Sequence, residues 1–367
     1  MVQFSKGKCL VMDESGKKLI SGVRTLDNCY GLILDANIVC NSIRLPNEDL
    51  WHQRMEHASY KHLSIVSKHE SVLEIPKLSR ISMIGELTHF LGLQIRQIDS
   101  GIFLFQSKFA KNLVKKFGLE SASSVRTSMS PNVKLIVDLL GKSVDSSLYR
   151  SMISSFLYLT TSRLDISYSV GVYARYQANP KESHMTTLKI IIKYVKTIVE
   201  FGVRYSKDTN DVLVGYSNAD WAGNTDDRKS TSGGCFYVGN NLVSWMSKKQ
   251  NSISLSTAEA EYIAAGSCCT QLLWMQKLLH DYGICQEHLT IYCDNTSAIN
   301  ISKNPVQHSR TKHIEIQHHF IRELVENGIL SLEFIHIDDQ KADLFTKPLN
   351  SKRFEFLRQN IGVIAMY

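Results

Sequence analysis

The order of strand-like and helix-like segments after Asp211 limits this chain to few folds. In chain order these segments are 212–220, 233–239, 241–256, 257–283, 289–295, 295–304, 309–328, 330–337 and 340–349. The first three, the fifth and the eighth have the β-branched and aromatic content of strands, and the others have helical periodicity. The order βββαβααβα predicts an α/β domain, in which helices cover the faces of one five-stranded mixed sheet.

Acidic side chains fall at the ends of these segments, where an α/β domain gathers its functional groups. Glu261 lies in the first turns of the long helix, Asp294 at the end of the fourth strand and Asp343 at the start of the last helix. The first strand offers Asn218 and Asp220. Hydrolysis of a phosphodiester with two Mg²⁺ or Mn²⁺ ions needs several carboxylates that converge on one point. One acidic residue at a helix start is more often a partner of the helix dipole, but four positions in this order indicate a metal site.

Around these positions the sequence carries a set of motifs. They read DDRKSTSGG (226–234), NLVSWMSKKQ (241–250), STAEAEYIAA (256–265), IYCDNTSAI (291–299), NPVQHSRTKHIEIQHHFIRE (304–323) and DQKADLFTKPL (339–349). The set closely resembles the ribonuclease H domain of Ty1/copia-type retrotransposon Pol polyproteins, almost continuously over Val212–Leu349. The resemblance implies a ribonuclease H-like fold, a divalent metal cofactor and cleavage of RNA in RNA–DNA hybrids. It places the catalytic acids at Asn218, Glu261, Asp294 and Asp343.

Asn218 departs from the family pattern, which has YSDAD where this chain has YSNAD. The missing aspartate is the family's bridging metal ligand, and a neutral amide lacks the anionic charge that this role requires. The substitution therefore predicts weak or absent hydrolysis. Asp220 shares a strand face with Asn218, but it lies about 6–7 Å further along, too far to bridge two ions. It remains a further candidate ligand. Glu259 lies about 200° around the helix from Glu261, so both cannot face one site.

Residues 79–206 are similar to the part of copia Pol that follows the reverse-transcriptase palm. They contain a predicted hairpin that turns at 99–101, an amphipathic helix over 107–120 and helices at 148–161 and 183–200. A polymerase needs a Tyr-x-Asp-Asp hairpin, and the adjacent aspartates of this chain, Asp226-Asp227 and Asp338-Asp339, are not in one. We therefore expect no polymerase activity. We also expect the apolar faces of this remnant to lack their usual partners.

Residues 1–78 resemble the gag-pre-integrase segment of the same polyproteins. The matching pieces are FSKGKCLVMD (4–13), RTLDNCYGL (24–32) and LWHQRMEHASYKHL (50–63). His52 and His57 match half of a zinc site, but the two cysteines that complete four-coordinate zinc are absent, so we expect no zinc. The integrase core is absent too, so no integrase activity is expected. The chain resembles a Pol polyprotein with an internal deletion joined near Arg80.

The sequence therefore predicts four parts: 1–78, a small segment of strands and a helix; 79–206, a hairpin and helices; 211–350, the ribonuclease H-like module; and 351–367, a C-terminal tail. No signal peptide or membrane-spanning stretch is evident, and the cysteines form no framework, so we expect an intracellular protein, cytoplasmic or nuclear.

Lys and Arg exceed Asp and Glu by 42 − 35 = 7, which allows a polyanionic partner without requiring one. Candidate nucleic-acid contacts, from the basic residues of the module, are Lys229, Lys248, Lys249, Lys303, Arg310 and Lys312.

Three hypotheses remain open at this point. The chain is a working but impaired ribonuclease H, a catalytically dead nucleic-acid-binding or structural remnant, or the product of a degenerate element that is never stably made. Other retrotransposon proteins are further candidate partners.

Overall fold

The computed structural model describes the backbone of four N-terminal strands and residues 88–132, 135–303 and 320–366. The chain divides into two compact units, 1–86 and 87–367. In the first unit, β1 (Val2–Phe4), β2 (Lys8–Met12), β3 (Lys18–Arg24) and β4 (Tyr30–Ile33) form an antiparallel sheet in that order. The expected short strands are present. His52, His57 and the junction near Arg80 lie outside the described residues.

The second unit contains the predicted five-stranded mixed sheet, in the order β11-β10-β9-β12-β13. Its strands are β9 (Leu213–Asp220), β10 (Thr231–Val238), β11 (Asn241–Lys249), β12 (Leu289–Cys293) and β13 (Leu330–Phe334). The first three pair antiparallel, whereas β12 pairs parallel with both β9 and β13. The predicted fold class is therefore confirmed.

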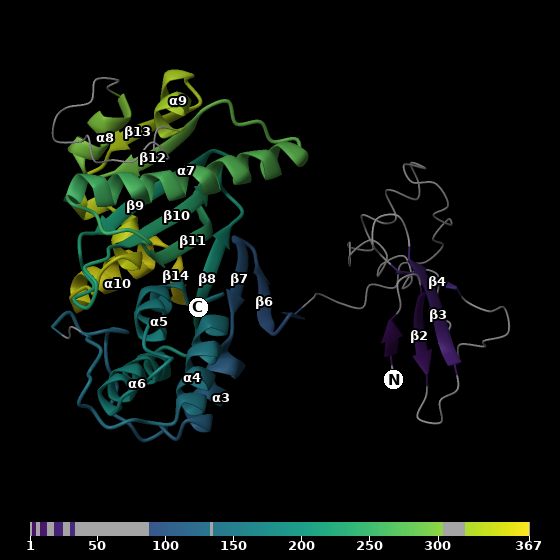
Figure 1. Cartoon of the computed structure of the whole chain (residues 1–367). Helices are drawn as coiled ribbons and strands as arrows, with labels where there is room; N and C mark the ends of the chain where they lie inside the picture. The colour runs from purple at the N-terminus through teal and green to yellow at the C-terminus, as the bar shows by residue number, and fades with distance from the viewer. Residues whose placement is uncertain are drawn as a thin grey trace. The chain divides into compact units, whose positions relative to one another are not determined.

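Helices cover both faces of this sheet. Helix α7 (Thr257–Asp281) runs along one face, with α8 (Thr296–Lys303) and α9 (Phe320–Glu326) nearby (Figure 1). The 3₁₀ turn η4 (Lys341–Phe345) lies on the other face, where a full helix had been predicted. Gly233 and Gly234 of β10 have no side chains, which lets η4 and α7 pack closely against the two faces of the strand. A Cβ on Gly234 would lie 2.7 Å from the Cys268 sulfur of α7, and one on Gly233 would lie 2.5 Å from Thr346.

A second sheet has the order β14-β8-β7-β6-β5. Its strands are β5 (His89–Phe90), β6 (Leu93–Ile98), β7 (Gly101–Phe105), β8 (Phe201–Ser206) and β14 (Val363–Ala365). The hairpin predicted at 99–101 is the β6–β7 turn. Residues 351–367, expected as a tail, form α10 (Ser351–Asn360) and β14, and β14 pairs with β8.

In the view of Figure 1, the helices of residues 107–200 lie below the mixed sheet and beside the second sheet. They are α3 (Ser107–Lys116), α4 (Ser146–Leu159), α5 (Ser167–Ala174) and α6 (Glu182–Thr197). One hydrophobic core joins them to β10, η4 and α10. Phe156 of α4, Leu188 of α6 and Phe345 of η4 are each fully buried in it. The expectation that this segment lacks partners for its apolar faces is therefore wrong for the faces that η4 and α10 cover, although Leu139, Leu140 and Leu157 are exposed.

A buried ion pair fixes the turn between α4 and α5. Arg163 donates two hydrogen bonds to Asp165, of 3.0 and 2.8 Å, and a third to the Ile198 carbonyl at 3.1 Å. Tyr194 also donates to Asp165. Both charged side chains are almost fully buried, so each satisfies the other where water is absent.

In the described part of the chain, no helix combines the length and the apolar content needed to cross a lipid bilayer.

Candidate active site

Four separate elements bring the predicted acidic positions to one edge of the mixed sheet. Asn218 is in β9, Asp294 follows the end of β12, Glu261 is in the second turn of α7, and Asp343 is in η4. β9 and β12 run parallel with Tyr216 opposite Tyr292, so continuing this register by two residues sets Asn218 beside Asp294. The parallel pairing therefore explains why positions 76 residues apart in the chain meet.

The closest group of metal-ligand atoms in the described residues comprises Glu261, Cys293 and Asp294. One ligand atom from each lies within 4.8 Å of the other two. Glu261 is buried and receives a hydrogen bond from the backbone amide of Ala219, while its Oε2 has no hydrogen-bond partner. A buried carboxylate oxygen without a donor is costly unless something positive satisfies it. A bound cation would give this oxygen the partner that it lacks.

Asp343 lies at the same edge but has protein partners. The Asn218 amide donates to its Oδ1, and the Lys347 ammonium lies 2.7 Å from the same atom. Arg353 lies 3.6 Å from the other oxygen, Oδ2. Asn218 and Asp343 are both buried, so their mutual hydrogen bond is shielded from water, whereas the Lys347 side chain is 37% exposed. The third carboxylate of the cleft is thus satisfied by the chain's own donors and cations.

Burial raises the pKa of two of these carboxyl groups. The pKa of Glu261 is raised well above its ordinary value, first by burial and then by the neighbouring Asp294. The pKa of Asp294 is raised by burial and by Asp343, and Lys347 opposes the rise. The crowded cleft was predicted to raise at least one such pKa, with Asp294 the first choice. The direction is confirmed for both groups, but burial contributes more than mutual repulsion.

Two other acidic residues stand apart from the group, as their positions predicted. Asp220 accepts the backbone N–H of Thr231 on the neighbouring strand, and burial raises its pKa to about 6. Glu259 accepts the Leu255 N–H at 2.7 Å and so caps α7. Neither side chain joins Glu261 and Asp294 within the described residues.

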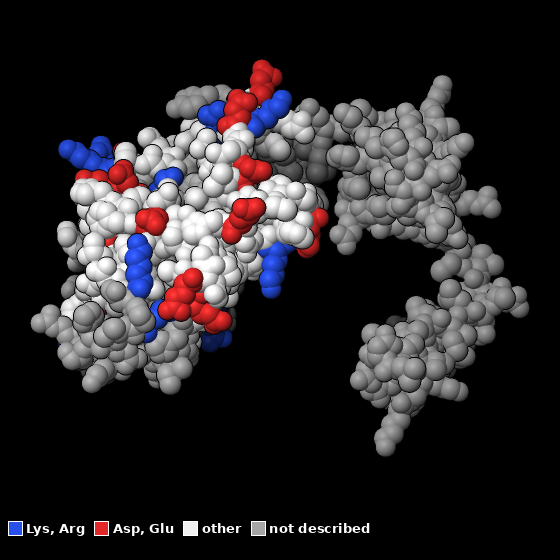
Figure 2. All heavy atoms as spheres, turned by 90° about the horizontal axis from the view of Figure 1, so that it is seen from above, with Lys and Arg blue, Asp and Glu red and all other residues white. Residues whose placement is uncertain are grey.

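The candidate basic contacts are scattered. Lys248 and Lys303 are exposed and Lys229 is half-buried, while Lys249 pairs with Asp227 at 2.5 Å. Arg310 and Lys312 lie outside the described residues. On the face drawn in Figure 2, basic and acidic side chains alternate across the surface. Among the described residues of this face, the basic side chains form no single patch of the kind that attracts a polyanion.

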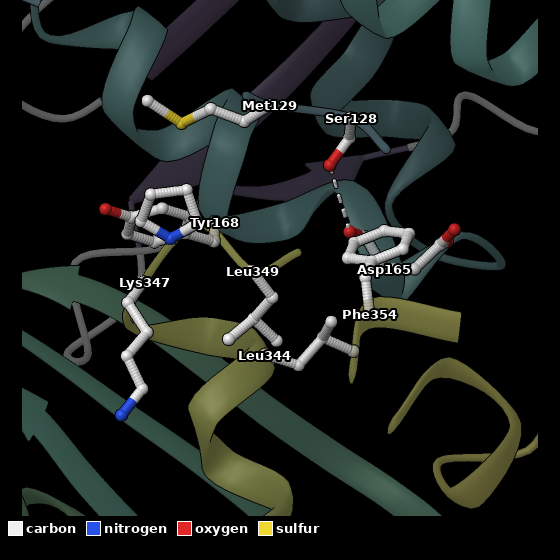
Figure 3. A pocket seen from close by; sticks show the side chains of 9 residues that line it. Ser128, Met129, Asp165, Tyr168, Leu344, Lys347, Leu349 and Phe354 are labelled. Carbon is white, nitrogen blue, oxygen red and sulfur yellow. Dashed lines mark hydrogen bonds between the residues drawn. The ribbon is translucent and has the colours of Figure 1, made fainter. Parts of the chain in front are cut away.

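A cavity of about 10 Å³ lies near this edge, between η4 and the helices of residues 107–200. Figure 3 shows Leu344, Leu349 and Phe354 beside Ser128, whose hydroxyl donates to the Asp165 carbonyl. The volume suffices for about one water molecule and for no organic ligand. This cavity is therefore too small to be a substrate site.

No family model matches the chain. A Retrovirus-related Pol polyprotein from transposon RE2 of Arabidopsis thaliana is 37% identical over 282 residues, which is 77% of this chain and 19% of the relative. One from transposon TNT 1-94 of Nicotiana tabacum is 32% identical over 289 residues, 76% of this chain and 22% of the relative. The uncharacterized mitochondrial protein AtMg00810 of Arabidopsis thaliana is 32% identical over 191 residues, 52% of this chain and 79% of that protein. The chain belongs to the retrovirus-related Pol polyproteins of copia-type transposons. It spans about a fifth of the length of the two Pol polyproteins named here.

The strand order β11-β10-β9-β12-β13, with β12 parallel to both of its neighbours, gives this part of the copia-type chain a ribonuclease H-like fold. The N-terminal RNase H domain of rv2228c from Mycobacterium tuberculosis is similar over 41% of this chain and 98% of that chain, at 8% identity and a TM-score of 0.29. A foamy viral protease-reverse transcriptase in complex with dsDNA is similar over 68% of this chain and 44% of that chain, at 12% identity and a TM-score of 0.40.

Several residues of the copia-type site were not identified from the sequence. They are Cys293, Lys347, Arg353 and Gln340, whose side-chain amide donates to the Ser217 carbonyl of β9 at 2.9 Å. The contact of Lys347 with Asp343 could have been predicted, because Lys347 follows Asp343 by four residues and so lies on the same face of a helical turn. Cys293 directly precedes Asp294, but its sulfur was given no role. Arg353 reaches the site from α10, which no pattern connected with the module.

Proposed function

We propose that residues 211–350 form the ribonuclease H-related module of a copia-type Pol polyprotein that holds one divalent cation and cleaves RNA–DNA hybrids only weakly. The observation that carries this proposal is the state of Asp343, which is bonded to the Asn218 amide and to Lys347. Two carboxylates, Glu261 and Asp294, remain to bind metal. Hydrolysis by the two-metal route needs a bridging carboxylate, and the amide at position 218 does not provide one.

The donor set fits one Mg²⁺ or Mn²⁺ ion. Glu261 and Asp294 supply the hard oxygen ligands that these ions prefer, and the unpartnered Oε2 of Glu261 is available. A cation bound here would polarise the scissile phosphate and help to activate water. A second ion has no such place, because Lys347 already neutralises Asp343.

The test is cleavage of a labelled RNA–DNA hybrid by the full chain in Mg²⁺ and in Mn²⁺. Asn218→Asp restores the family's bridging carboxylate, and we expect it to raise the rate at least about tenfold, taking the effect of indirect metal contacts as a floor. Asn218→Asp combined with Glu261→Gln should remove this gain. Asp220→Asn should change little in either background.

The proposal fails if the wild type already cleaves at the rate of Asn218→Asp. It fails in a specific way if Asp220→Asn then abolishes that cleavage, because Asp220 would have taken over the bridging role.

A catalytically dead nucleic-acid-binding or structural remnant is the second candidate. The core that joins 211–350 to the helices of 107–200 favours it, since a chain can keep this packing after losing its chemistry. Hybrid binding without cleavage, unchanged by Asn218→Asp, would support binding alone. If the chain neither binds nor cleaves the hybrid, a structural role remains.

The remaining domain assignments extend the proposal. We propose that 79–206 is a reverse-transcriptase remnant without polymerase activity and that 1–78 is a gag-pre-integrase-like segment without zinc or integrase activity. The proposed nucleic-acid contacts in the described residues are Lys229, Lys248, Lys249 and Lys303. Charge reversal at Lys248 and Lys303, which are exposed, should weaken hybrid binding without changing the unfolding temperature.

A further inference from the structure

Three apolar side chains are exposed beside the cleft, where β9 ends. Trp221, Ile253 and Leu255 are 53%, 53% and 67% exposed. Trp221 follows Asn218 by three residues, and its indole Nε1 donates to the Ser254 carbonyl at 3.1 Å. Ser254 lies between Ile253 and Leu255 in the chain, so the indole ring is held against the segment that carries both aliphatic residues. We call Trp221, Ile253 and Leu255 the apolar platform.

The segment 250–256 is held in place by buried hydrogen bonds. Gln250 is buried, and its side-chain amide donates to the Ser232 hydroxyl at 3.0 Å and to the Ala260 carbonyl at 2.9 Å. The Ser254 hydroxyl donates to the amide oxygen of Gln250 at 3.0 Å. These bonds satisfy the polar groups under the segment. The platform is therefore exposed although the structure below it is ordered.

The backbone next to Trp221 adopts a conformation that residues other than glycine rarely take. Ala222 has a φ of 52°, and its N–H donates to the Ser230 hydroxyl at 3.0 Å. Such a conformation persists only when the surrounding structure enforces it, and it is found most often at functional sites. This turn fixes the direction in which the chain leaves β9, so Trp221 is positioned before any ligand arrives.

The platform adjoins the cleft on two sides. β9, which ends next to it, carries Asn218, and α7, which begins just after it, carries Glu261. Exposed apolar groups on a rigid support, next to a functional cleft, are typical of binding surfaces. An occupant of the platform therefore lies next to whatever the cleft binds.

We propose that the apolar platform stacks an unpaired base, so that a hybrid with a single-stranded extension binds more tightly than a blunt hybrid. That the occupant is a nucleic acid rests on the proposed function of the neighbouring cleft. Paired bases turn their edges to the grooves and cover each other's faces, so only an unpaired base offers a flat apolar face. Such a face stacks on an exposed aromatic ring with little dependence on which base it is.

The polar groups around the platform fit a phosphate backbone. The segment 250–256 contains no acidic residue, and its exposed Asn251 and Ser252 carry hydrogen-bond donors. Exposed Lys248 lies just before this segment. On the other side, the carboxylate of Asp220 accepts a backbone N–H of the neighbouring strand and is thus occupied within the protein. A nucleotide can therefore reach the platform without facing a carboxylate from segment 250–256.

The experiment measures the binding of the full chain to fluorescein-labelled RNA–DNA hybrids by anisotropy in EDTA, where no metal-dependent cleavage occurs. One hybrid is blunt, another has a short unpaired extension, and a further one has the same extension made of abasic nucleotides. The abasic extension keeps the charge and the sugar–phosphate backbone but removes the bases. The wild type should bind the extension with bases at least about fivefold more tightly than the abasic extension.

Trp221→Ala should bind the two extensions equally. Trp274→Ala is the matched control, because Trp274 is 58% exposed and lies about 20 Å along α7 from Glu261. It should keep the preference for the extension with bases. Trp221→Phe protects the test against misfolding, because it keeps an aromatic ring and loses only the indole N–H. It should retain most of the preference.

A wild type that binds both extensions equally, or a Trp221→Ala protein that keeps the preference, would refute the proposal. An equal loss in Trp274→Ala would refute it too. Self-association that Trp221→Ala abolishes, without base-dependent binding, would assign the platform to a second copy of the chain instead. Base-dependent binding without cleavage in any variant would overturn the proposed function alone, and cleavage without base-dependent binding would overturn this inference alone.

Discussion

Replacing Asn218 by aspartate should make the metal-free protein less stable. The Asn218 side chain is about 1% exposed, and its amide donates to Asp343. The variant loses this hydrogen bond, which to a charged acceptor contributes about 1.5–3 kcal/mol, and sets two carboxylates against each other. At about 4 Å and an effective dielectric constant of about 20, the repulsion is about 4 kcal/mol. Lys347 and Arg353 offset part of it, so we expect a net loss of about 2–4 kcal/mol in the free energy of unfolding.

Mg²⁺ should return much of this stability to the variant and less to the wild type. A ligand that binds only the native state stabilises it by about 2.7 kcal/mol at a hundred times its Kd. If the aspartate tightens metal binding tenfold, the variant gains about 1.4 kcal/mol more than the wild type at saturating concentrations. The measurement is urea unfolding of both proteins in EDTA and in a series of Mg²⁺ concentrations.

Asn224→Asp is the matched control for this experiment. Asn224 is also buried, and its amide donates to Asp227 at 2.8 Å, but no group of candidate ligands surrounds it in the described residues. It should lose stability in EDTA and regain none of it in Mg²⁺. A metal-free Asn218→Asp protein as stable as the wild type, or an equal Mg²⁺ response in both variants, would refute the reasoning about the cleft.

Three further predictions concern charged groups of the same unit. Burial raises the pKa of Asp220 from 3.8 to about 6. Between these pH values the native state keeps a proton that the unfolded chain has lost, so the free energy of unfolding falls as pH rises. In urea unfolding, Asp220→Asn should match the wild type at pH 4 and be more stable by about 1–3 kcal/mol at pH 7.5. Arg163→Met leaves the buried Asp165 carboxylate unpaired and should cost about 3–5 kcal/mol in urea unfolding, and a loss below about 1 kcal/mol would contradict this. Burial raises the pKa of Asp294 and the charge of Lys347 opposes the rise, so Lys347→Met should move the onset of Mg²⁺-induced stabilisation to higher pH in thermal unfolding measured across a pH series.

Much of the fold could be predicted because it depends on local patterns. β-branched and aromatic content predicted β9 and β12, and the turn at 99–101 predicted the β6–β7 hairpin. The N-cap Ser256 and the glycine at 283 bracket α7 closely. Other elements escaped prediction because their stability comes from distant partners. β8 pairs with β7, about 100 residues before it, and the three-residue β14 pairs with β8 across about 160 residues.

The sequence by itself determined which residue types reach the cleft and in what order, because strand ends and helix starts follow from periodicity and turn residues. It also determined that position 218 carries no charge. Only the tertiary structure decided what surrounds these groups. The parallel pairing of β9 with β12 set Asn218 beside Asp294, and the docking of η4 brought Asp343 with Lys347 against the Asn218 amide. The helices of residues 107–200 found their apolar partners in η4 and α10. Such contacts join segments far apart in the chain, and their energies depend on burial, which no local pattern specifies.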